Sequence, residues 1–171
     1  TFYNYFSSKE SLLIALFEEK IQIMYDNLRQ CISDKLELKE GLFKISKVFI
    51  EFVQSNISFF ILIKRNKLYR KDVFQKKINE DFHEKIDVEL LDIIIEFFNM
   101  YRDNIRRDYP LREICRFYQT SIAAFMVDSI VDCDVVFDKD NFENRAFSYG
   151  SSDDMARFFV AMFIEGILTK D

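Results

Sequence analysis

Residues that form turns and residues that carry catalysis are both scarce in this sequence. Its 171 residues include three Gly, one Pro, one His and no Trp, alongside 20 Phe and 8 Tyr. So few glycines and prolines argue against a sheet-rich fold with many tight turns and favour a small number of long helices. We therefore predict an all-α fold, in a chain long enough to bury a hydrophobic core.

The single histidine restricts the chemistry that the chain can perform. Glu80 and His83 resemble half of a carboxylate-bridged di-iron site, but the other half needs a second histidine, which the sequence lacks. Asp138 and Asp140 begin like a calcium-binding loop, but Glu143 occupies the position where such a loop requires glycine. Glycine-rich phosphate loops are absent as well. We therefore expect no catalytic residues, no metal site and no cofactor, and a protein that is not an enzyme.

Cysteines and long apolar runs are also few. Cys31, Cys115 and Cys133 are widely spaced, without a C-x-x-C pair, which suits a reducing cytoplasm and gives neither a disulfide framework nor a zinc site. The longest apolar run, FFVAMFI at 158–164, is far too short to span a bilayer. We expect a cytoplasmic protein without a membrane partner.

Hydrophobic periodicity predicts a series of helices. Ser7 and Glu10 have the spacing of a capping box, so a first helix is expected over about residues 8–32. The apolar residues of this helix recur at helical spacing and predict its buried side: Leu13, Leu16, Phe17, Met24, Leu28 and Cys31. Further helices are predicted over about 38–53, over the short segment ISFFILI, from about 72 to beyond 100, over about 110–131, and from Ser151 or Ser152 onward.

The first residues, TFYNYF, have the pattern of a short helix with one buried side. Phe2 and Phe6 are four apart and share a face, so Asn4 points away from them, flanked by Thr1 and Tyr3. A short helix of this kind suits the second helix of a helix-turn-helix. An ordinary frayed N-terminal turn accounts for the spacing equally well.

The longer stretch T-F-Y-N-Y-F-S-S-K-E-S-L-L resembles the recognition-helix signature of the TetR (tetracycline repressor) family. Thr1, Tyr3, Phe6, Lys9 and Leu12 fall on the positions of that signature. The match covers about the first 13 residues, and the remaining chain agrees with the family in length and helix order without a motif of its own.

The resemblance implies a ligand-responsive, DNA-binding transcriptional repressor. Residues 1–33 would hold the end of the helix-turn-helix and a connecting helix, and residues 34–171 the ligand-binding and dimerisation domain. The two helices that precede the recognition helix in that family would then be missing, and with them most of the positive charge. The net charge of −5 therefore does not count against DNA binding. The residues expected to face operator DNA are Thr1, Tyr3, Asn4, Tyr5 and Lys9.

A run of Lys and Arg between residues 64 and 77 has two interpretations. We favour the solvated surface of a helix–loop junction. By the resemblance, the same run would lie near the DNA and strengthen the attraction of phosphates.

Aromatic residues are abundant in the middle helices. Phenylalanines at helical spacing usually form core, but the resemblance also implies an apolar cavity for a hydrophobic inducer, which would favour a conformation that leaves a palindromic operator. The residues expected to line this cavity are Phe49, Phe52, Phe60, Phe82, Phe97, Tyr101, Phe117 and Tyr118.

The last helix is apolar on every side and so needs cover on every side. The helix over about 110–131 has a similar excess in IAAFMV at 122–127. Pairing both helices with the same two of a second subunit would form a four-helix bundle, which is also how the TetR family dimerises. The residues expected in this homodimer interface are Phe125, Met126, Met155, Phe158, Phe159, Met162 and Phe163.

Two other functions remain open from the sequence. One is a helical homodimer that binds a lipid-like ligand or a protein partner without DNA. The other, a helical-bundle metalloenzyme, is disfavoured by the single histidine.

Overall fold

The computed structural model describes residues 9–58, 83–131 and 151–167 of the chain. These segments form five α-helices and one 3₁₀ turn, and they contain no strand. The prediction of an all-α fold is therefore confirmed for the described residues. The helices are α1 (Lys9–Ser33), α2 (Leu38–Ser55), α5 (His83–Met100), η3 (Arg102–Asn104), α6 (Leu111–Val131) and α8 (Ser152–Ile167).

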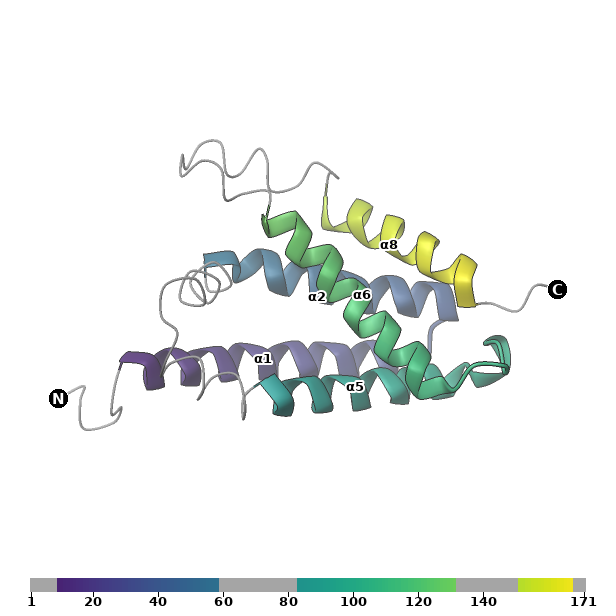
Figure 1. Ribbon diagram of the computed structural model, residues 1–171, viewed down its shortest axis with the longest axis horizontal. Helices are drawn as coiled ribbons and strands as arrows, with labels where there is room; N and C mark the ends of the chain where they lie inside the picture. Colours follow the sequence, from purple (N-terminus) through teal and green to yellow (C-terminus); the bar gives the residue numbers. More distant parts are fainter. Residues whose placement is uncertain (1–8, 59–82, 132–150, 168–171) are drawn as a thin grey trace.

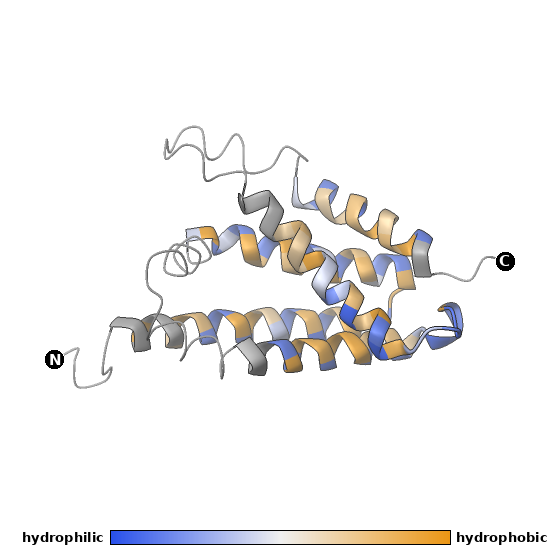
Figure 2. Ribbon diagram, in the orientation of Figure 1, coloured by the Kyte–Doolittle hydropathy of each residue, from blue (hydrophilic) through white to orange (hydrophobic). Residues whose placement is uncertain are grey.

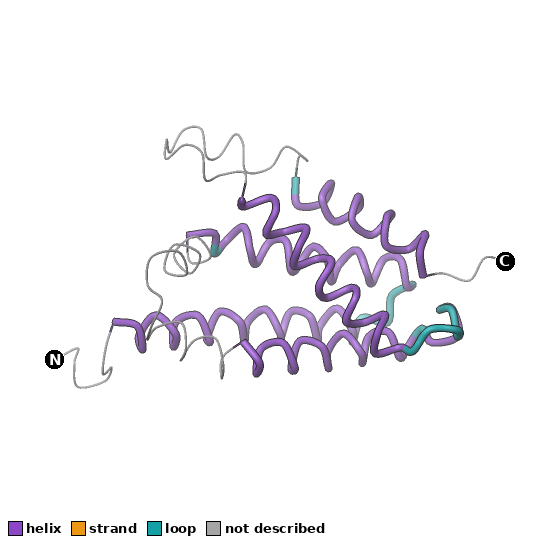
Figure 3. Tube along the Cα trace, in the orientation of Figure 1, coloured by secondary structure: helices purple, strands orange, loops and turns teal. Residues whose placement is uncertain are grey.

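The helices form two layers joined by a crossing helix (Figure 1). α1 and α5 lie side by side in one layer, and α2 and α8 pack on each other in the second. α6 starts beside α5, crosses α2 and reaches α8. Figure 3 shows short connections between α1 and α2 and between α5 and α6.

The predicted helix limits agree closely with the observed ones for α1, α2, α6 and α8. For the long helix expected from about residue 72, only the part from His83 falls within the described residues. Most of ISFFILI and the basic run after it lie outside the described residues. The acidic loop before α8 lies outside them as well.

One hydrophobic core draws side chains from all five α-helices, and Figure 2 shows hydrophobic residues along each of these helices. On α1 the prediction was right for Phe17, Met24, Leu28 and Cys31, which are buried, but wrong for Leu16, which is 48% exposed. Leu16 lies about 100° around the helix from Phe17, outside the sector that faces the core.

The turn between α1 and α2 is held by side chains from α2 and from the segment after α5. Lys35 has a φ of 48° and ends α1 in the left-handed conformation common after helix C-termini. Tyr101, which follows α5, donates a hydrogen bond from its hydroxyl to the Leu36 carbonyl. Lys44 of α2 pairs with Asp34 at 3.4 Å. These contacts fix the direction of α1 relative to α2.

Gly41 allows α2 to approach the end of α5 closely. A Cβ at this position would lie 2.7 Å from Cε2 and 2.9 Å from Cζ of Phe97. The Phe97 ring has little room to withdraw, because it is buried and packs against the rings of Phe98 and Tyr101 at centroid distances of 5.4 and 5.0 Å.

We predict that Gly41→Ala destabilises the protein, by roughly 1 kcal/mol or more. Inside an unhindered helix the same change would stabilise by up to about 1 kcal/mol, so the sign of the effect reports the contact with Phe97. Urea unfolding followed by circular dichroism measures it. In a Phe97→Leu background, Gly41→Ala should cost less; a stabilising Gly41→Ala in the wild-type background would contradict the close packing.

Candidate functional site

α8 begins at a reciprocal cap. The backbone N–H and the hydroxyl of Ser151 both donate to Oδ2 of Asp154, at 3.0 and 2.7 Å, and the Asp154 N–H donates back to the Ser151 hydroxyl at 3.3 Å. The hydrogen bonds from Ser151 hold the pKa of the Asp154 carboxyl below its ordinary value. Of the two caps that the sequence allowed, Ser151 is therefore the one that starts the helix.

Polar contacts hold this first turn of α8 on α2. Lys47 pairs with Asp153 at 2.6 Å, and the Ser152 hydroxyl donates to Glu51 at 3.3 Å. Farther along, the guanidinium of Arg157 lies 4.5 Å from the centre of the Phe43 ring. The rotation of α8 about its own axis is thereby set, and with it the side that remains exposed.

The buried side of α8 uses several residues that were expected in the dimer interface. Met155, Phe159 and Phe163 are buried within this one chain, as is Met126 of α6. A side chain already covered inside its own chain has almost no surface left for a partner, so these four are corrected to core residues. Sequence periodicity cannot tell which side of an all-apolar helix its own chain covers.

The outer sides of α6 and α8 carry exposed apolar side chains. Met162 is 64% exposed, Phe158 45% and Phe117 of α6 61%. Ala161 and Ala124 are exposed beside them, on the same sides of their helices. We call these five residues the α6–α8 face.

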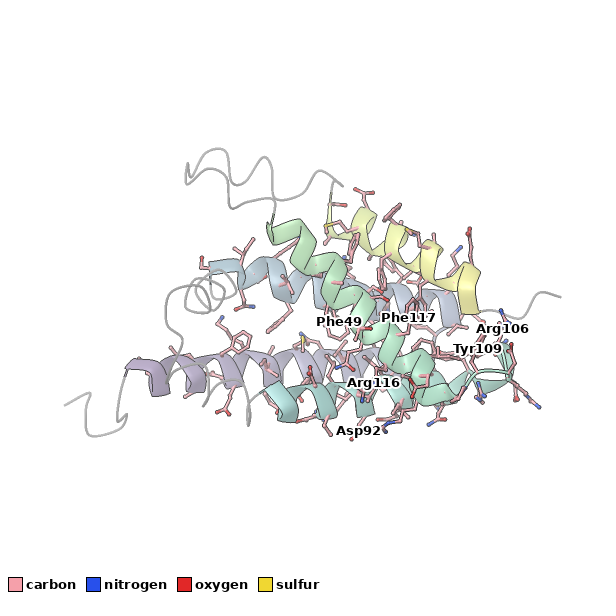
Figure 4. The ribbon with its side chains drawn as sticks, in the orientation of Figure 1. Phe49, Asp92, Arg106, Tyr109, Arg116 and Phe117 are labelled. Atoms are coloured by element: carbon pink, nitrogen blue, oxygen red, sulfur yellow. The ribbon has the colours of Figure 1, made fainter. Side chains whose placement is uncertain are left out.

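Ring contacts join the two halves of the α6–α8 face. The Phe117 ring stacks on that of Phe163 at 6.0 Å, and Phe125, which is half-buried, packs against Phe158 at 6.2 Å. Figure 4 labels Phe117 on α6. The expectation that Phe117 lines an internal cavity is wrong, because its ring lies on the outside; Tyr118, one residue on and about 100° around the helix, is the one that points inward.

Most of the other expected cavity residues lie in the core. Phe49, Phe97 and Tyr118 are buried, whereas Phe52 and Tyr101 are half-buried. Figure 4 shows Phe49 on the side of α2 that faces α1. Phe60 and Phe82 lie outside the described residues.

Tyr118 occupies the centre of an aromatic cluster. Its ring makes edge contacts with Phe98 of α5 at 5.7 Å and with Phe159 and Phe163 of α8 at 5.7 and 5.0 Å. Its hydroxyl lies 2.9 Å from the Ser46 hydroxyl of α2. Burial raises the pKa of the Tyr118 hydroxyl above its ordinary value, so the group stays protonated and available as a hydrogen-bond donor.

Ser46 and Gln119 are buried polar residues that the sequence did not single out. Gln119 donates from Nε2 to the Asp87 carbonyl of α5 at 3.1 Å. Burying a polar group without a partner costs about 1–3 kcal/mol, so each such group needs a physical account. In the sequence each is a single polar residue on the apolar side of a helix. Hydrophobic periodicity does not identify such residues, because one polar position hardly changes the pattern.

The two described cysteines are buried and unreactive. Burial raises the pKa of the Cys115 thiol to about 12, and burial also raises that of Cys31. Both therefore stay protonated near neutral pH. Within the described part of the chain, no group of three or more His, Cys, Asp or Glu side chains is placed to hold a metal ion.

Of the residues expected to face DNA, Thr1, Tyr3, Asn4 and Tyr5 lie outside the described residues, and Lys9 is the first residue of α1. None of the described helices is both long and apolar enough to cross a membrane. No protein-family model matches the chain, and neither a curated protein nor a solved structure matches it.

Proposed function

We propose that this protein is a ligand-responsive, DNA-binding transcriptional regulator of the TetR type that works as a homodimer through the α6–α8 face. The observation that carries the proposal is that face. The adjoining helices α6 and α8 leave Phe117, Phe158 and Met162 exposed, and the Phe117 ring stacks on Phe163 of α8. Exposed apolar side chains that gather in this way mark interaction sites.

A second copy of the chain is the partner that fits this face best. A two-fold axis would bring α6 and α8 of each subunit against the same helices of the other and form a four-helix bundle. The small side chains of Ala124 and Ala161 would let the helix axes approach closely. With both subunits included, we expect a buried area of at least about 2,000 Å², in the class of obligate dimers.

The connection of α1 to the body supports a regulatory role. Arg29 of α1 pairs with Glu89 of α5 at 2.9 Å, and the turn after α1 is fixed by Tyr101 and Lys44. Because the recognition-helix signature ends within the first turns of α1, a change in the ligand-binding body would be passed to the DNA-binding segment. In a dimer, the two recognition helices would have to meet half-sites about 34–36 Å apart.

We predict that Met162→Lys converts the dimer into folded monomers. The new charge would be buried without a partner in the interface, whereas in the monomer it lies on an exposed helix surface and costs little. Sedimentation velocity at micromolar concentration, with circular dichroism to check folding, measures both effects.

Val88→Lys is the matched control, since Val88 is 51% exposed and lies on α5, in the layer that α5 shares with α1. It should leave the dimer intact. A monomeric wild-type protein, or equal effects of the two lysines, would count against the α6–α8 face as the interface.

DNA binding is tested with Lys9→Ala in the full-length protein. By the resemblance, Lys9 contacts a phosphate, so its loss should weaken binding to all DNA sequences and reduce the slope of log affinity against log salt by about one. Lys39→Ala, at an exposed position on α2, is the control and should change neither.

The alternative is a helical homodimer that binds an apolar ligand without DNA. For that protein, fluorescence anisotropy would detect no salt-dependent DNA binding even by the full-length wild type, while the dimer would persist.

A further inference from the structure

The Ser46 and Tyr118 hydroxyls form an isolated polar pair inside an apolar core. Both residues are fully buried, with 0% of their surface exposed, and their oxygens are 2.9 Å apart. Ser46 comes from α2 and Tyr118 from α6, so the pair lies where α6 crosses the second layer.

A count of hydrogen atoms shows that the pair is incomplete. Each hydroxyl has one hydrogen to donate, and whichever group donates, the bond between them uses one of the two. The described residues supply no further hydrogen bond to either hydroxyl. One hydroxyl hydrogen is thus left without an acceptor in a place that solvent does not reach.

Neither hydroxyl donates a hydrogen bond to a nearby backbone carbonyl of its own helix. A Ser or Thr within a helix often donates to the carbonyl four residues earlier, as Thr120 does to Arg116 at 2.8 Å. Ser46 makes no such bond. The Tyr118 ring packs against Phe98, Phe159 and Phe163, which keeps its hydroxyl beside Ser46.

We infer that the spare hydroxyl hydrogen of the Ser46–Tyr118 pair anchors a small apolar ligand through a neutral acceptor oxygen, such as that of a ketone, ester or ether. The inference rests on the ligand-binding part of the proposed function. An unpaired buried donor calls for an acceptor, and the apolar surroundings call for an apolar body around it.

The charge of the ligand follows from the same surroundings. No Lys, Arg or His is among the buried residues that the structure describes. A carboxylate or phosphate would therefore be buried without a countercharge, which is strongly unfavourable. An ammonium group offers only donors and cannot accept the spare hydrogen. A neutral oxygen fits, and a single buried water is the competing occupant.

The test compares matched probes that differ only in the acceptor oxygen. The pairs are acetophenone with ethylbenzene and benzophenone with diphenylmethane, each titrated into the wild-type chain while the melting temperature is followed by circular dichroism. We expect the ketone of at least one pair to bind about fivefold more tightly than its hydrocarbon, the effect of one neutral hydrogen bond.

The decisive variant is Ser46→Ala combined with Tyr118→Phe. Removing both hydroxyls leaves no unpaired group, so this double variant should fold with nearly wild-type stability, whereas each single change leaves one buried hydroxyl alone. In the double variant the ratio of ketone affinity to hydrocarbon affinity should fall to about one. Cys115→Ala, which alters a buried side chain one turn from Tyr118 and keeps both hydroxyls, is the control and should retain it.

Equal binding of ketone and hydrocarbon, no binding of either, or a preference that survives in the double variant would overturn the inference; the first two are what a buried water alone predicts. Sedimentation of the same samples separates this result from the proposed function. A dimer without ketone preference contradicts only the anchor, while a monomer that keeps the preference contradicts only the dimer.

Discussion

The burial of Tyr118 is the interaction on which the arrangement of the other helices depends. Its ring meets Phe98 of α5 and both Phe159 and Phe163 of α8, and its hydroxyl bonds to Ser46 of α2. Each edge-to-face contact contributes about 0.5–1.5 kcal/mol beyond the area that it buries. One α6 residue thus fixes the positions of α2, α5 and α8 relative to α6.

The exposed face of the molecule follows from this arrangement. Tyr118 and Phe159 are turned inward, whereas Phe117 and Phe158, each about 100° back around its helix, lie exposed on the outer side. The cap at Ser151 and the ion pair between Lys47 and Asp153 keep α8 in that rotation. The orientation of α8 therefore determines which of its apolar side chains face outward, and a second copy is the partner that we propose for them.

Sequence periodicity was sufficient for the helices and insufficient for the site. It gave the limits of α1, α2, α6 and α8 closely, because few glycines and prolines interrupt long apolar repeats. It failed at Leu16. It also did not separate the inner side of α8 from the outer side that carries Phe158 and Met162, because nearly every residue from Met155 to Ile164 is apolar and the pattern has no polar side to orient it. Ser46 and Gly41 carried no periodic signal, since their roles depend on contacts with residues far along the chain.

The central claim is that two copies of this chain meet through the outer sides of α6 and α8. The most direct test places one spin label at Ala161, by Ala161→Cys with Cys133→Ser, and measures label-to-label distances by pulsed electron resonance. Packed helix axes lie about 8–10 Å apart, so pairing through this face predicts one short, narrow distance distribution. A label with no dipolar partner, or a broad distribution at long distance, would contradict the account.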